Sequence, residues 1–159
     1  MSIYGYCRIS TAKQSIDRQI RNIKAEYPTA HIVQEAYTGT SIFRPEWLKL
    51  YRILKSGDIV VFDSVSRMSR NAEEGFALYE DLYHKGIRLV FLKEHHIDTE
   101  TYKKALSGSI AMTGTNVDFI LKGINEYLMA LAKEQIKLAF EQSEKEVADL
   151  HQRLSLIHI

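Results

Sequence analysis

The chain has 159 residues, of which 45% are apolar and 26% are charged, and its formal net charge is +1. This composition fits one soluble globular domain with length left for an appendage, and the single cysteine excludes a disulfide framework. No secretory signal opens the chain and its apolar runs are too short to span a membrane, so we expect a cytoplasmic protein. The near-zero charge gives no global nucleic-acid signature, so any DNA affinity must come from local clusters of arginine or from another basic segment.

The first strand, from about Ile3 to Ile9, delivers an arginine and then a serine at its end. Residues two apart on a strand point to the same side, so Arg8 and Ser10 should project together at its carboxyl end. That edge is where open α/β sheets build their sites. A hydroxyl beside a guanidinium suits chemistry on a phosphate, because the serine can attack while the arginine holds the anion.

Helical and strand patterns alternate along the next eighty residues. They predict helices near 16–27, from Pro45 to about 54 and from 72 to 85, and strands near 31–36, 59–62 and 87–92. Asn71 is a candidate cap for the third helix, and Cys7 is expected to be a small core residue. The order predicts an α/β fold with a mostly parallel sheet of about four to five strands flanked by helices.

A helical pattern then runs from about 116 to 153 with only Gly123 interrupting it. A helix of this length would reach about 55 Å at ~1.5 Å per residue, whereas the preceding domain should be only ~35 Å across. The helix must therefore project or break, and a projecting apolar stripe needs a partner, most simply a second copy of the chain. The stripe consists of Val117, Ile120, Ile124, Leu128, Leu131 and Leu138. We expect a core at 1–115, an interface helix at 116–153 and a tail at 154–159 without assigned function.

Four arginines fall where strands or loops are expected to end: Arg8, Arg44, Arg67 and Arg70. The spacing of Arg67 and Arg70 predicts that the two residues lie on neighbouring sides of one turn at the start of a helix. Cations at that end of a helix oppose its dipole. Any one of these residues can be explained as a solvated surface charge. Together with Ser10 they favour an anion-binding site.

The opening Tyr6-Cys7-Arg8-Ile9-Ser10-Thr11, with Gln14, Asp17 and Gln19 at set offsets, resembles the catalytic domain of serine recombinases, the resolvase/invertase family. The later Ser66-Arg67-Met68-Ser69-Arg70-Asn71 and the long helix with Glu134 are similar to the same family. The resemblance extends from about residue 2 to residue 153. It implies a site-specific DNA recombinase in which Ser10 attacks a phosphodiester, forms a 5′-phosphoserine link and leaves a free 3′-hydroxyl.

The same resemblance implies a role for each site residue. Arg8, Arg67 and Arg70 would hold the scissile phosphate, and the supporting residues would be Gln19, Arg44, Asp63 and Glu134. It further implies double-stranded DNA as partner, assembly of dimers and tetramers through the long helix, and no metal or cofactor. Family members usually carry a DNA-binding domain after that helix, and none is expected after Arg153.

Two positions depart from the family pattern. Ser66 stands where many members have an aspartate, with Asp63 three residues earlier, and Gln135 stands where an arginine is familiar. These departures leave open a catalytically weak or inactive relative that acts as a DNA-associated dimerisation module. A flavodoxin-like phosphate binder is a more distant alternative, because no glycine-rich loop follows the first strand.

Overall fold

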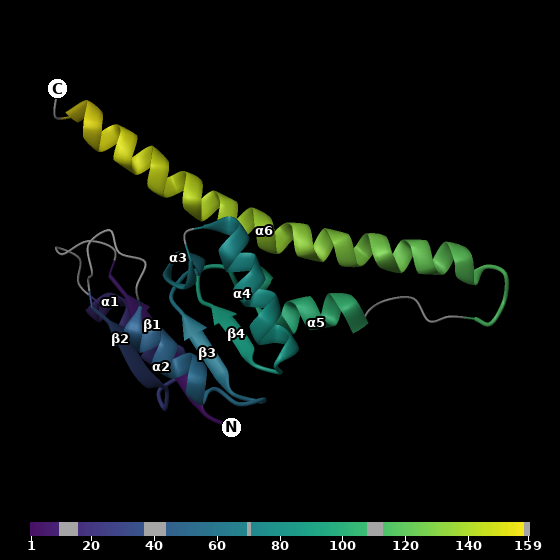
Figure 1. Ribbon diagram of the computed structural model, residues 1–159, viewed down its shortest axis with the longest axis horizontal. Coiled ribbons are helices and arrows are strands. Elements are labelled where there is room, and N and C mark those ends of the chain that lie inside the picture. Colours follow the sequence, from purple (N-terminus) through teal and green to yellow (C-terminus); the bar gives the residue numbers. More distant parts are fainter. Residues whose placement is uncertain (10–15, 37–43, 70, 108–112, 158–159) are drawn as a thin grey trace.

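The computed structural model describes residues 1–9, 16–36, 44–69, 71–107 and 113–157, with the backbone alone described at 105–107 and 143–157. Its strands are β1 (Ile3–Arg8), β2 (His31–Glu35), β3 (Ile59–Phe62) and β4 (Arg88–Phe91). Its helices are α1 (Asp17–Glu26), α2 (Pro45–Ile53), α3 (Val65–Met68), α4 (Ala72–His84), the 3-10 helix η1 (His95–Ile97), α5 (Thr99–Ser107) and α6 (Asp118–Ile157). Figure 1 shows α6 lying across the domain and extending past it on both sides.

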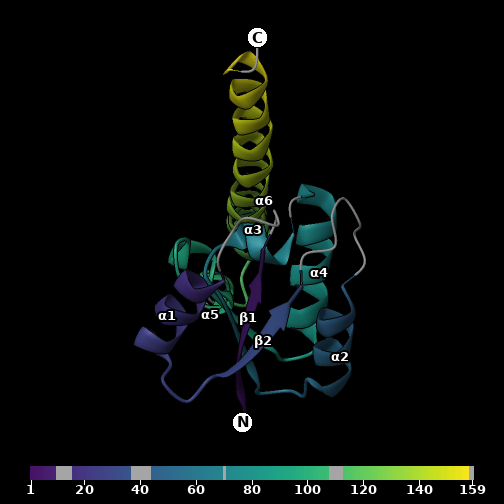
Figure 2. The same ribbon diagram turned by 90° about the vertical axis from the view of Figure 1, so that its left-hand side faces the viewer.

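The four strands form one parallel sheet in the order β2-β1-β3-β4. This confirms the predicted α/β fold. Because all four strands run the same way, their carboxyl ends share one edge of the sheet (Figure 2). In register, Arg8 at the end of β1 pairs with Glu35 at the end of β2, and Tyr6 pairs with Phe62 of β3.

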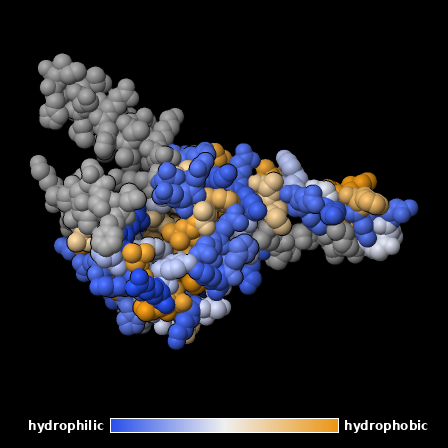
Figure 3. Space-filling view, in the orientation of Figure 1, coloured by the Kyte–Doolittle hydropathy of each residue, from blue (hydrophilic) through white to orange (hydrophobic). Residues whose placement is uncertain are grey.

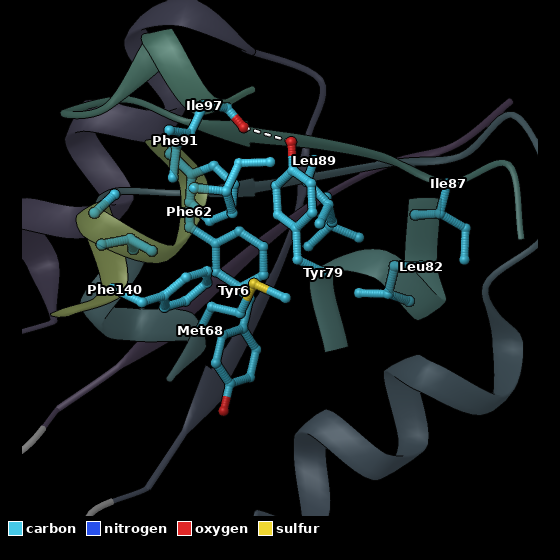
Figure 4. Close-up of a cluster of buried hydrophobic side chains, with 14 of the residues drawn as sticks. Tyr6, Phe62, Met68, Tyr79, Leu82, Ile87, Leu89, Phe91, Ile97 and Phe140 are labelled. Carbon is cyan, nitrogen blue, oxygen red and sulfur yellow. Dashed lines mark hydrogen bonds between the residues drawn. The ribbon is translucent and has the colours of Figure 1, made fainter. Parts of the chain in front are cut away.

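Aromatic side chains fill the larger of two cores, on the sheet face that α2, α4 and α6 cover. Phe62 stacks on Phe91 with ring centroids 5.3 Å apart, and Tyr79 of α4 stacks on Phe91 at 6.1 Å. The buried Tyr79 hydroxyl donates a 2.6 Å hydrogen bond to the carbonyl of Ile97, and Phe140 of α6 completes the cluster (Figure 4). Each such aromatic pair adds about 0.5–1.5 kcal/mol beyond its buried area.

Helix α1 covers the opposite face of the sheet and forms the smaller core. Ile23 of α1 is fully buried there, together with Cys7 and Val61 from the central strands. Burial raises the pKa of the Cys7 thiol to about 12, so the thiol stays protonated at neutral pH. Cys7 is therefore the small core residue that the sequence predicts.

Helix α6 is continuous through Gly123 and projects rather than breaks. It packs on α4, α5 and α3, and the buried residues among its described side chains are Ile136, Ala139 and Phe140. The predicted apolar stripe stays exposed: its members range from 37% exposure at Leu128 and Leu131 to 66% at Ile120. Figure 3 shows apolar side chains on the part of α6 that extends beyond the domain. None of the described helices combines the length and apolar character that crossing a bilayer requires.

Gly75 of α4 lies against the Phe140 ring of α6, and two glycine substitutions test this contact. A Cβ on Gly75 would lie 2.5 Å from ring atoms of Phe140, whereas a Cβ on Gly123 would meet nothing within 4 Å. We predict that Gly75→Ala destabilises the fold by about 1–3 kcal/mol through overpacking. Gly123→Ala should instead gain about 0.5–1 kcal/mol, because alanine is the better helix former. Urea unfolding measures both, and an unchanged Gly75→Ala protein would contradict this packing.

Candidate active site

The site begins where β1 leaves the sheet, and a buried glutamine of α1 fixes that point. Gln19 is 3% exposed, its Oε1 accepts a 3.1 Å hydrogen bond from the Arg8 amide, and its Nε2 donates to the Arg8 carbonyl at 2.8 Å. Both backbone groups of Arg8 are thus satisfied without a further strand. Gln19 therefore sets the direction in which the chain leaves the sheet.

The short helix α3 is the second part of the site, and arginine side chains bind its backbone carbonyls. Arg8 donates from Nη2 to the Ser66 carbonyl at 2.7 Å and from Nε to the Arg67 carbonyl at 3.3 Å. Arg44, which precedes α2, donates from Nη1 to the Met68 carbonyl at 2.5 Å. The last carbonyls of a helix lack partners within the helix and attract cations, so these contacts fit elementary helix electrostatics.

Arg67 returns the contact from α3 to β1. Its Nη1 donates to the Arg8 carbonyl at 3.1 Å, so Arg8 and Arg67 each bind the backbone of the other's segment. Burial lowers the pKa of the Arg67 guanidinium, the Asp63 carboxylate acts in the opposite direction, and an arginine remains charged in any case. Its Nε is buried and has no acceptor among the described residues. A partly buried cation with an unused donor favours an anionic ligand.

Asp63 follows β3 and is held from two neighbouring elements. The residue is 2% exposed, its Oδ1 accepts a 2.8 Å hydrogen bond from Nδ2 of Asn22, and its Oδ2 lies 3.4 Å from Nζ of Lys93. Asn22 comes from α1 and Lys93 from the turn after β4. The sequence analysis did not identify these two partners. The sequence signal for each partner was a polar side chain within or beside an apolar element.

Glu35 is a further residue that the sequence analysis missed. It is 2% exposed at the end of β2 and accepts hydrogen bonds from the Trp47 amide at 3.0 Å, the Tyr6 hydroxyl at 3.3 Å and the Glu46 amide at 3.4 Å. Its carboxylate thereby caps the start of α2, next to Arg44. An acidic residue at a strand end, ten residues before a helix that begins with Pro45, was the signal in the sequence.

The expected shared turn of Arg67 and Arg70 is wrong, because Arg67 does not lie at the start of the following helix. Helix α3 ends at Met68, Ser69 is extended with φ −161° and ψ 151°, and α4 begins only at Ala72. The Ser69 hydroxyl accepts from the Asn71 amide at 3.1 Å, a local bond that competes with helix formation. Asn71 caps α4 as predicted, through a 3.0 Å bond from the Glu74 amide.

Three predicted site residues remain, namely Ser10, Arg70 and Glu134. Ser10 and Arg70 lie outside the described residues. Glu134 lies on the exposed side of α6, two residues before the buried Ile136. In the described part of the chain the site therefore unites Arg8, Arg44, Arg67, Gln19 and Asp63.

We predict that Gln19→Ala destabilises the protein by about 1–3 kcal/mol, because it leaves the part-buried amide of Arg8 without its acceptor and removes one of the two donors to the Arg8 carbonyl. The matched change Gln34→Ala, at an exposed position of β2, should stay within ~0.5 kcal/mol of the parent protein. Urea unfolding gives both values, and equal stabilities of the two variants would show that Gln19 does not fix the end of β1.

Three comparisons with known proteins agree with one another. The family model "Resolvase, N terminal domain" matches residues 3–148. The chain is 26% identical to the transposon Tn21 resolvase of Escherichia coli, covering 94% of this chain and 82% of that protein. It is 31% identical to a resolvase of Clostridium perfringens over 61% of this chain, which is about half, 52%, of that relative's length. A resolvase family site-specific recombinase from Streptococcus pneumoniae shares the fold, with a TM-score of 0.51, 18% identity, and coverage of 100% of this chain and 99% of that one.

Proposed function

Because the match to the resolvase N-terminal domain extends from residue 3 to residue 148, this chain belongs to the resolvase family, and we propose that it catalyses site-specific DNA recombination. The proposed reaction is cleavage and rejoining of double-stranded DNA through a serine ester. The observation that carries the proposal is Arg67, a partly buried guanidinium beside Arg8 whose buried Nε has no acceptor among the described residues. A DNA phosphate supplies the anion that such a group requires.

In the proposed mechanism the Ser10 hydroxyl attacks the phosphorus of a phosphodiester. A new Oγ–P bond forms as Oγ gives up its proton, the bond between phosphorus and the 3′ oxygen breaks, and that oxygen takes up one proton and leaves as a 3′-hydroxyl. Arg8, Arg67 and Arg70 neutralise the charge that gathers on the phosphoryl oxygens. The N–H groups of Arg8 and Arg67 need little reorganisation, because contacts with the backbone hold both side chains. The serine ester conserves the energy of the broken linkage, so rejoining requires no cofactor.

The supporting residues act mainly by holding this arrangement. Gln19 fixes the exit of β1, Arg44 ties the end of α3, and the Asp63 side chain bonds to Asn22 and Lys93 rather than to the described arginines of the site. We therefore assign Asp63 a positioning role. Glu134 would act from α6, on the side that faces away from the domain core.

We propose that α6 joins copies of the chain, with 1–115 as the catalytic core and 116–153 as the interface helix. Ile120, Ile124, Leu128 and Leu131 remain between 37% and 66% exposed in the single chain. Covering such side chains is worth about 1.5–3 kcal/mol each. A DNA substrate also places the protein in the cytoplasm under this proposal.

The decisive variant is Ser10→Ala. The protein, with any further segment that its gene encodes, is incubated with fragments of its source genome, and covalent protein–DNA adducts are separated under denaturing conditions. We predict that Ser10→Ala abolishes the adduct, whereas Ser56→Ala, at an exposed turn serine, retains it. An adduct that persists in Ser10→Ala would move the nucleophile to Ser66 or Ser69. A parent protein that binds DNA without any adduct would favour the inactive dimerisation module.

Arg67→Lys should reduce the rate of adduct formation by ~10²-fold or more, because a point charge cannot reproduce the planar guanidinium contacts. Arg21→Lys, the same change at an exposed position of α1, serves as the control. The rate is measured at saturating DNA in a single turnover. Near-parental cleavage by Arg67→Lys would show that Arg67 only attracts DNA.

The double change Leu128→Glu and Leu131→Glu should weaken self-association, because it places two carboxylates in the exposed stripe of α6. Ala130→Glu adds a carboxylate to the same helix outside the stripe and should leave association intact. Sedimentation at several protein concentrations separates these outcomes. A parent chain that stays monomeric with and without DNA would contradict an interface on α6.

A further inference from the structure

Helix α3 carries the site arginine Arg67, but no side chain of its own segment caps its first turn. The preceding residue, Ser64, makes no side-chain cap, and its hydroxyl bonds instead to the Ser66 hydroxyl at 2.6 Å. A helix of four residues satisfies few of its own amides, so the first amide needs an acceptor from elsewhere. Glu94 supplies it: one carboxylate oxygen accepts a 3.0 Å hydrogen bond from the Val65 amide.

Glu94 is itself held by regular structure. Its amide donates to the Phe91 carbonyl at the end of β4, and its carbonyl accepts from the amide of the buried Ile97, both at 3.1 Å. The neighbouring Lys93 binds the residue before Ser64 twice: its amide donates to the Asp63 carbonyl at 3.1 Å, and its Nζ lies 3.4 Å from Asp63 Oδ2. Three polar contacts thus join the turn after β4 to the turn after β3.

The charges at the two ends of α3 are complementary. A carboxylate lies at the start, where helix dipoles favour negative charge, and the guanidinium groups of Arg8 and Arg44 bind the carbonyls at the end. Burial raises the pKa of Glu94, and the hydrogen bond from Val65 acts in the opposite direction. The carboxylate is therefore placed at a desolvation cost that its contact with α3 offsets in part.

From these contacts we infer that Glu94 is a positioning residue, which acts through the Val65 amide to orient α3 and with it the Arg67 guanidinium. This inference rests on the proposed function and extends it by a residue outside the family motifs. Glu94 does not contact the reacting atoms. Its effect comes from placement, and small displacements of a catalytic group are costly in rate.

The test compares Glu94→Ala, Glu94→Gln and a matched control, Asp58→Ala. Asp58 accepts hydrogen bonds from the backbone amides of Ser2 and Lys55, both at 2.9 Å, so its loss removes the same kind of contact before β3, at the opposite edge of the sheet. We expect Glu94→Ala to slow single-turnover adduct formation by about 10-fold or more while DNA affinity changes less than ~2-fold. Glu94→Gln keeps an acceptor for Val65 and should restore most of the rate. Asp58→Ala should leave the rate unchanged.

Three results would overturn the inference: a parental rate in Glu94→Ala, an equal loss in Glu94→Gln, or a loss of DNA affinity with the rate intact. A separate readout covers the case in which the parent protein forms no adduct, which would refute the proposed function. The side-chain Nε–H NMR signal of Arg67 should move in Glu94→Ala and return toward its parental position in Glu94→Gln. An Arg67 signal that is the same in all three proteins would refute the positioning role on its own.

Discussion

The reciprocal contact between Arg8 and Arg67 joins two segments that are 59 residues apart in the chain. Each guanidinium donates to a backbone carbonyl of the other's segment, so neither side chain can move without breaking a hydrogen bond between the two segments. Such bonds to a charged donor contribute more than ordinary hydrogen bonds, about 1.5–3 kcal/mol each. The end of β1 and the helix α3 consequently behave as one unit, and the rest of the candidate site is arranged around it.

The hydrophobic core packs against this unit. Val65 and Met68 of α3 are each 2% exposed, and the same cluster contains Phe62 of β3 and Phe140 of α6. Four residues of helix would not be stable alone, so their geometry depends on this packing. Helix α6 therefore touches the segment that carries Arg67 and also presents the exposed apolar stripe. In the proposed recombinase the element that joins subunits is packed directly against the site.

Much of this arrangement follows from local patterns in the sequence. The alternation of strands and helices predicts the parallel sheet, the strand end at Arg8 predicts the edge on which the site lies, and Asn71 is recognisable as a cap. The contacts of Asp63 with Asn22 and Lys93 are different, because they depend on which elements lie side by side. No spacing along the chain specifies them. The same is true of the contact of Glu94 with α3.

The wrong prediction for Arg67 shows why local sequence patterns fail where distant elements meet. The spacing of Arg67 and Arg70 suggests a shared helical turn, but the Ser69 hydroxyl bonds to the backbone of Asn71 and the chain there is extended. Ser69 is 7% exposed, so this local bond forms where water does not compete with it. Burial, which sequence spacing does not reveal, decides between the helix and the turn.

The most direct test of the account follows the side-chain Nε–H NMR signals of the arginines while a short DNA duplex is added at constant ionic strength. Arg67 should shift and saturate with the duplex, because its buried Nε gains a phosphate acceptor. Arg88 is the matched control, because its Nε is also buried without a hydrogen-bond acceptor among the described residues, although it lies 3.1 Å from a carboxylate oxygen of Glu100. Arg88 begins β4, at the opposite edge of the sheet from the site, so its signal should not shift. If the exposed Arg18 and Arg21 of α1 respond while Arg67 stays unchanged, DNA binds elsewhere and the arginine cluster at the sheet edge is not a phosphate site.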